Sequence, residues 1–146
     1  MISFASSGGV FSKISFTEEQ MDYLEYLDEA KLIRRLYSDD LSVKKMQKPD
    51  KILMDNCNLL KVLALKEPNI GTLRETFFCN QLGYQHQVEY SKQGDFLIDH
   101  QITFEIGGQA KEGKQVAAVE NAYIVADDIE YSYGNKLPIW LFGLLY

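Results

Sequence analysis

Residues 95–106 read DFLIDHQITFEI, and the other predicted elements can be placed around this stretch. Two runs of strand-forming residues flank the polar triplet DHQ, which is typical of a β-hairpin with a three-residue loop. Pairing Ile98 with Ile102 fixes the register and puts Asp95 opposite Glu105. Because side chains alternate along a strand, Phe96, Ile98, Ile102 and Phe104 share one apolar face and these two carboxylates share the other.

The opposed carboxylates, Asp95 and Glu105, are the strongest chemical signal in the sequence. Their Cβ atoms are expected about 5 Å apart, where like charges destabilise a strand pair. A cation, a raised pKa on one carboxyl group, or exposure to solvent would relieve the repulsion. Two carboxylates from adjacent strands suit Mg²⁺ or Mn²⁺. The spacing therefore leaves two alternatives open: a divalent metal site, or an exposed hairpin end.

Helices and further strands are predicted on both sides of the hairpin. Capping boxes at Thr17–Gln20 and Thr72–Glu75 indicate two helix starts. The first helix is expected to bury a stripe that includes Tyr23 and Ala30 and to carry Arg34 and Arg35 near its end. The remaining expected elements are helices at 58–65 and 72–82, a short helix within 107–119, a C-terminal helix from Pro138, and strands at 36–38, 51–54, 87–91, 95–98, 102–106 and 123–126.

This alternation predicts an α/β or α+β fold, with a mixed sheet covered by helices. The composition fits a globular domain: 146 residues, 46% hydrophobic and 25% charged. The net charge of −6 argues against binding nucleic acid over a broad surface, which needs a basic patch. Cys57 and Cys79 form no CxxC motif, so we expect a reducing, cytoplasmic setting. The sequence shows neither a signal peptide nor an apolar run of membrane-spanning length, and no membrane partner is expected.

Several motifs, taken together, resemble one protein family. They are NIGTLRETFF (69–78), YSKQGDFLID (90–99), TFEIGG (103–108), YIVADD (123–128) and NKLPIWLFGLLY (135–146). They look like the C-terminal part of bacterial AAA-type ATP-binding proteins, whose last domain has no assigned function. The usual layout is a P-loop ATPase, a winged-helix segment and a domain similar to PD-(D/E)xK nucleases, which have the restriction-endonuclease-like fold.

The resemblance implies two domains in this chain. Residues 1–54 would be a partial winged-helix segment, because the first helix is followed by two strands and a lysine-rich loop at 39–50. Residues 55–146 would be the nuclease-like α/β domain. The motif GxxxxGK[ST] does not occur in the sequence, so the chain lacks the P-loop of the family's ATPase.

The nuclease-like pattern can be carried over position by position. The acid of the first helix falls on Glu75, the aspartate of the second strand on Asp95, and the acid of the (D/E)xK motif on Glu105. The motif's lysine would stand at position 107, where this chain has Gly107. Without it, the site is poorly equipped for hydrolysis. Lys111 or Lys114 from the following segment are candidates to replace it. Glu75 also has a local alternative role, as the last residue of the second capping box.

These expectations favour a catalytically degenerate, nuclease-like, non-ATPase domain. It would act in recognition of a partner protein, of the P-loop ATPase module of the same or another chain, or of nucleic acid. One alternative is a Mg²⁺-dependent nuclease in which Glu75, Asp95, Glu105 and Lys111 are catalytic, and Asp95 and Glu105 bind the metal. Another is a structural module that forms homo-oligomers through the plentiful aromatic side chains, 9 Tyr and 8 Phe.

Overall fold

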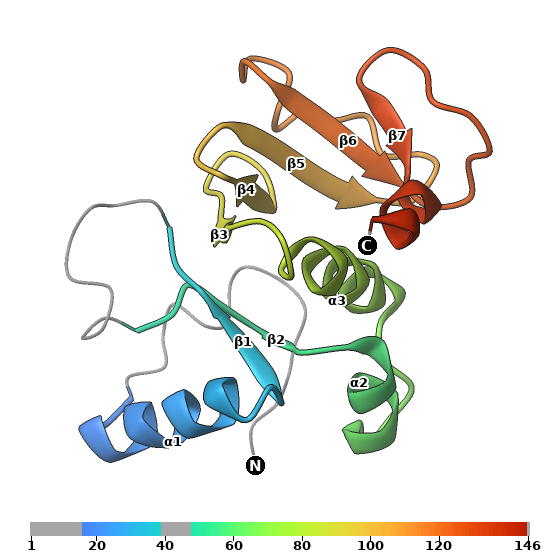
Figure 1. The fold of residues 1–146 in the computed structure, drawn as a ribbon. Helices are drawn as coiled ribbons and strands as arrows, with labels where there is room; N and C mark the ends of the chain where they lie inside the picture. Colours follow the sequence, from blue (N-terminus) through green and yellow to red (C-terminus); the bar gives the residue numbers. More distant parts are fainter. Residues whose placement is uncertain (1–15, 39–47, 146) are drawn as a thin grey trace.

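The computed structural model describes residues 16–38 and 48–145, and its elements form two sheets with a long helix between them (Figure 1). The elements in chain order are α1 (Glu18–Glu29), β1 (Ile33–Leu36), β2 (Lys51–Met54), α2 (Cys57–Leu63), α3 (Ile70–Leu82), β3 (Val88–Tyr90), β4 (Phe96–Ile98), β5 (Ile102–Gly107), β6 (Ala122–Ala126), β7 (Lys136–Pro138) and the 3-10 helix η2 (Ile139–Leu144). α3 contacts both β2 and β5, so it joins the two sheets.

The larger sheet has five strands in the order β3-β4-β5-β6-β7. β3, β4 and β5 pair antiparallel, whereas β5, β6 and β7 pair parallel. The hairpin predicted at 95–106 is confirmed in its register, since Ile98 pairs with Ile102 and Phe96 with Phe104. The fold is therefore mixed α/β, as the sequence predicted.

An aromatic cluster fills the space between α3 and one face of this sheet. Phe78 on α3 lies at its centre, with ring centroids 5.4 Å from Phe96, 5.1 Å from Phe104 and 4.8 Å from Phe142. Tilted and edge-to-face rings at these separations contribute stabilisation beyond the apolar area they bury. Phe142 comes from η2, so the C-terminal segment docks on the core as predicted, although as a 3-10 helix rather than an α-helix.

The connection between β5 and β6 packs against the opposite face of the sheet. Val116 from this connection packs with Ala122 and Ile124 of β6 in a small second apolar cluster. The prediction of a short helix within 107–119 is wrong, because residues 108–121 form turns and irregular backbone. This face therefore has a layer of irregular chain, and part of the candidate site belongs to that layer.

The first helix begins as predicted but ends earlier. Thr17 and Gln20 form the reciprocal hydrogen bonds of a capping box. α1 then ends at Glu29, because Lys31 adopts a left-handed backbone conformation (φ 57°) and the chain turns into β1. Arg34 and Arg35 are consequently strand residues, and their expected place near the end of the helix is wrong. The predicted stripe is also wrong in part, since Tyr23 is 58% exposed and Ala30 is an exposed cap residue.

The start of α3 also differs from the prediction. Asn69 is the N-cap, and its side chain accepts a hydrogen bond from the N–H of Gly71 at 2.7 Å. Thr72 therefore lies inside the helix, and the capping box expected at Thr72–Glu75 is wrong. Because Glu75 lies in the second turn of α3, its carboxylate is available for contacts outside the helix.

β7 and the first strand also differ from the elements expected from the sequence. β7 was not predicted, because it has three residues and one of them is Pro138. The first strand lies at Ile33–Leu36 rather than at 36–38, although its antiparallel pairing with β2 agrees with the expected pair of strands. Most of the lysine-rich loop expected at 39–50 falls outside the described residues. Within the described ranges, no helix has both the length and the apolar character needed to cross a membrane.

Candidate functional site

Glu105 and Lys111, two of the predicted site residues, form an ion pair beside the end of β5. Glu105 is the fourth residue of β5, and Lys111 lies in the connection that follows this strand. The Nζ atom of Lys111 is 2.9 Å from Oε1 of Glu105. A lysine is therefore paired with the acid of the (D/E)xK pattern, but it comes from a later point in the chain than the pattern requires.

Gly107 allows Lys111 to take this position. A Cβ atom placed on Gly107 would lie 2.7 Å from Cγ and 2.8 Å from Cβ of Lys111, which is closer than real side chains approach. The aliphatic stem of Lys111 thus occupies the space above position 107. A lysine at position 107 and Lys111 in its present place exclude each other.

Glu105 is buried, so it does not lie at an exposed hairpin end, which was one of the two alternatives for the opposed carboxylates. Its exposed fraction is only 1%, so its charge is removed from water. Lys111 compensates one carboxylate oxygen, whereas no described residue donates a hydrogen bond to Oε2. A buried carboxylate oxygen without a partner is uncommon and costly in native proteins.

Asp95 lies directly before β4 and is held by the backbone of β5. Its Oδ2 atom accepts a hydrogen bond from the N–H of Ile106 at 2.6 Å, and its own N–H donates to the carbonyl oxygen of Phe104 at 2.8 Å. The carboxylate therefore extends the pairing of the two strands by one step.

Lys51 is a charged residue of the site that the sequence analysis missed. It is the first residue of β2, and its Nζ atom lies 3.0 Å from Oε1 of Glu75 on α3. The same ammonium group is 5.0 Å from the ring centroid of Phe96, the residue next to Asp95. Residues 51 and 75 are far apart in sequence, and no local pattern signals their contact.

The pKa of Glu75 indicates how these groups influence one another. Burial raises it above the ordinary value of 4.5, because desolvation disfavours the charged form. The charge and hydrogen bond of Lys51 act in the opposite direction, the nearby charge of Asp95 raises the pKa, and the charge of Lys111 lowers it. Charged residues from β2, from the start of β4 and from the connection after β5 therefore all act on the pKa of Glu75.

Lys114, the other candidate to replace the missing lysine, is outside the site. It is 84% exposed and pairs with Glu112, the Nζ–Oε2 distance being 2.6 Å. No group of three or more His, Cys, Asp or Glu side chains within 16–38 and 48–145 is arranged to hold a metal ion. Mg²⁺ is commonly held by one or two carboxylates together with water or substrate oxygens. The unpartnered Oε2 atom of Glu105 is a feature that fits such an ion.

His86 and Asp127 also contact charged side chains. His86 Nδ1 lies 2.7 Å from Oδ2 of Asp99, and this contact lowers the pKa of Asp99 below 3.8. Asp127, which directly follows β6, pairs with Arg74 of α3 at 3.1 Å. These contacts hold the ends of elements together.

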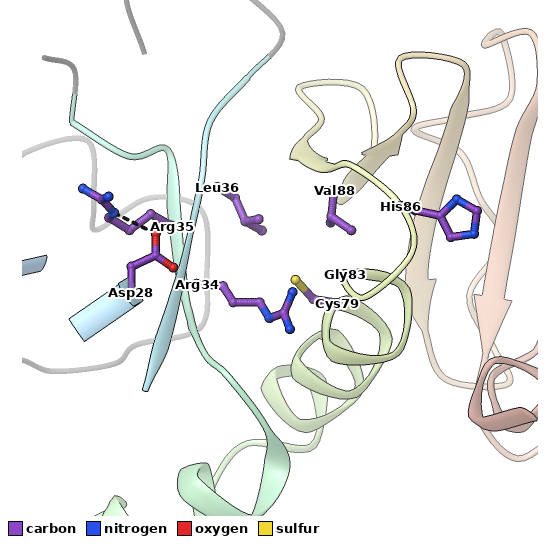
Figure 2. Close-up of a pocket in the computed structure, with 8 residues that line it drawn as sticks. All are labelled: Asp28, Arg34, Arg35, Leu36, Cys79, Gly83, His86 and Val88. Carbon is purple, nitrogen blue, oxygen red and sulfur yellow. Dashed lines mark hydrogen bonds and ion pairs between the residues drawn. The ribbon is translucent and has the colours of Figure 1, made fainter. Parts of the chain in front are cut away.

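A cavity of about 150 Å³ lies between β1 and the end of α3 (Figure 2). Arg34 extends from β1 toward Gly83, whereas the His86 ring points away from the arginines. The charges here are compensated, because Arg34 pairs with Asp55 at 2.9 Å and Arg35 with Asp28 at 3.0 Å. We therefore regard this cavity as part of the packing between the two sheets.

The site thus combines two lysines and three carboxylates from five segments of the chain, and its chemistry has to be inferred from these residues. Comparison with models of protein families, with curated proteins and with solved structures finds no match for this chain.

Proposed function

We propose that this chain is the C-terminal, non-ATPase part of an AAA-type ATP-binding protein. In this proposal the five-stranded sheet has the restriction-endonuclease-like fold, and its site is a degenerate nuclease site that acts in recognition. The motifs at 69–78, 90–99 and 103–108 support the relationship. The mixed sheet, with α3 packed on one face, is compatible with it.

One observation supports the proposal of a degenerate site: each of its three carboxylates already has an ion pair or a hydrogen bond with another residue of this chain. Lys111 neutralises Glu105, Lys51 neutralises Glu75, and the N–H of Ile106 donates to Asp95. A metal ion would have to compete with these contacts. Such a network holds the segments of the site together without an ion.

A protein is the partner that the charge of the chain favours. With a net charge of −6, the chain as a whole repels a phosphate backbone. We therefore propose the P-loop ATPase module, in the same or another chain, as the partner that this domain recognises.

A Mg²⁺-dependent nuclease is the second candidate, and the position of Lys111 favours it. Asp95 and Glu105 would hold the ion, and Oε2 of Glu105 would gain a partner. The ion would supply Lewis-acid activation of a phosphodiester and of the attacking water. Lys111 would orient the water from its place beside Glu105, and Glu75 and Lys51 would position the neighbouring backbone.

Metal binding and plasmid cleavage distinguish the two candidates. Calorimetric titration with Mn²⁺ and Mg²⁺ is carried out on the wild type, on Asp95→Asn and on Asp128→Asn, which removes an exposed acid outside the site. Supercoiled plasmid is incubated with the same three proteins and the same ions. The degenerate site predicts neither binding nor nicking in any of them.

Nicking by the wild type and Asp128→Asn that is lost in Asp95→Asn would reject the degenerate site and establish the nuclease. Binding without nicking, lost only in Asp95→Asn, would show a metal site that retains no hydrolysis. That result would also contradict the proposal that the contacts with Lys111, Lys51 and the N–H of Ile106 hold the site together without an ion.

A further inference from the structure

Lys136 is a buried lysine whose role the proposed function leaves unexplained. It lies in β7 with an exposed fraction of only 7%. Its Nζ atom donates to the carbonyl oxygens of Gln109 at 2.7 Å and of Lys111 at 2.9 Å, and it is 6.0 Å from the ring centroid of Tyr133. Burying an ammonium group is costly unless hydrogen bonds compensate for the loss of water. Here the compensation comes from the backbone of the connection between β5 and β6.

Lys136 and Glu105 lie in one row across the sheet. Glu105 pairs with Ile124 on β6, and Ile124 pairs with Lys136 on β7. Residues in register on neighbouring strands place their side chains on the same face. Gly113 lies against the middle of the row, because a Cβ atom there would meet Cδ1 of Ile124. The three positions of the row thus contact residues 109–113 of a single connection.

Lys111 is held at both ends by this row. Its carbonyl oxygen accepts from Lys136, and its Nζ atom reaches Oε1 of Glu105. The second carbonyl bound by Lys136 belongs to Gln109, two residues earlier. With the backbone fixed at two points, the side chain of Lys111 has fewer conformations to lose when it pairs with Glu105.

We propose that Lys136 is a positioning residue, which fixes the backbone at 109–111 so that the ammonium group of Lys111 is held beside Glu105. The proposal deepens the site described above, and its functional meaning rests on the proposed function of that site. Its structural content, the dependence of the Lys111–Glu105 pair on Lys136, can be tested without metal, nucleotide or nucleic acid.

Acetylation of individual lysines, followed by peptide mass spectrometry, measures this dependence. The wild type is compared with Lys136→Met, which removes the donors, and with Lys136→Gln, whose shorter side chain is not expected to reach both carbonyls. Lys114 serves as the reference for an exposed lysine in the same connection, and Lys51 as the reference for a paired lysine on another strand.

In the wild type, Lys111 is expected to react about tenfold more slowly than Lys114, since its ammonium group is held in a charge-assisted pair. In both variants its rate should rise toward that of Lys114, while the rate of Lys51 stays unchanged. The unchanged rate at Lys51 separates loss of positioning from general unfolding, and Lys136→Gln keeps the test decisive if Lys136→Met does not fold.

Two results would overturn the inference. One is a Lys111 rate in the variants that equals the wild-type rate. The other is an equal acceleration at Lys51 and Lys111, which would show general loosening. The metal and plasmid assays test the function of the site separately, so failure of that function leaves this measurement interpretable.

Discussion

The aliphatic stem of Lys111 packs directly over Gly107, the position at which the nuclease-like pattern would have its own lysine. The absence of a lysine at position 107 and the position of Lys111 are therefore connected, because both side chains would need the same space. A side chain at 107 cannot be added without moving Lys111. Recovering the usual pattern by substitution at 107 would disrupt the pair that Lys111 forms with Glu105.

Gly107→Ala is predicted to lower the free energy of unfolding by about 1–3 kcal/mol, because the added methyl group overpacks the Lys111 stem. Gly108→Ala is the matched control, since its Cβ would meet the Arg74 guanidinium only at 3.4 Å. Urea denaturation of both variants measures the difference. Equal stabilities for the two would contradict the close packing of Lys111 on Gly107.

Lys51→Met is predicted to raise the pKa of Glu75 further above 4.5. The substitution removes the charge and the hydrogen bond that oppose the effect of burial. Carboxyl NMR titration of Glu75 measures the change, with Lys114→Met as a control that removes a lysine outside the site. A Glu75 pKa that is the same in both variants would show that Lys51 does not act on it.

The same shift predicts how stability depends on pH. A carboxyl group whose pKa is raised in the folded state favours folding fully only below its unfolded pKa, and this contribution is lost as pH rises through the folded pKa. The stability of Lys51→Met should therefore fall relative to wild type as pH increases from 4 toward neutrality. Thermal unfolding across this range tests the sign, and a constant difference would contradict it.

The hairpin and its register could be predicted from the sequence because the pattern is local. Alternation of apolar and polar side chains determines which residues face each other, and Ile98 and Ile102 pair as expected. Thr17 was identified as a cap for the same reason. Asn69 was missed because Thr72, three residues later, offers an equally good capping pattern, and the end of α1 was missed because a lysine rather than a glycine adopts the left-handed turn.

The candidate site could be predicted only in part. Glu75, Asp95 and Glu105 were expected from the resemblance to a nuclease motif, and Lys111 was expected because it lies close to Glu105 in sequence. Lys51 and Lys136 reach the site or its connection from β2 and β7, so their contacts depend on tertiary packing. No periodicity in one sequence reports such long-range pairs.

His86→Gln is predicted to raise the pKa of Asp99 toward its ordinary value of 3.8, because the hydrogen bond from His86 is the largest cause of its depression. A depressed carboxyl pKa stabilises the fold above the unfolded pKa, and this contribution is lost as pH falls through the folded pKa. Acid unfolding of His86→Gln should therefore begin at a higher pH. His100→Gln is the comparison, and it should shift Asp99 less, since His100 contributes a smaller charge effect.

The two cysteines are predicted to differ in reactivity. Burial raises the pKa of Cys79 to about 12, so it holds almost no thiolate at pH 8. Cys57 is only half-buried, although burial raises its pKa too. A thiol reagent should modify Cys57 in the native protein and Cys79 only after denaturation, and Cys57→Ser should leave no native reactivity. Rapid native labelling of Cys79 would contradict the packing around Phe78.

The ion pairs Arg34–Asp55 and Lys51–Glu75 have a consequence for dividing the chain into domains. Both connect the first sheet to residues beyond position 54, the boundary that the sequence suggested. A fragment beginning at residue 55 would retain Asp55, which is only 5% exposed here, and Glu75 without the cations that compensate them. Loss of one partner of a buried charge pair is strongly destabilising. The two sheets are therefore expected to unfold as one cooperative unit, and the smallest autonomous fragment has to include β1 and β2.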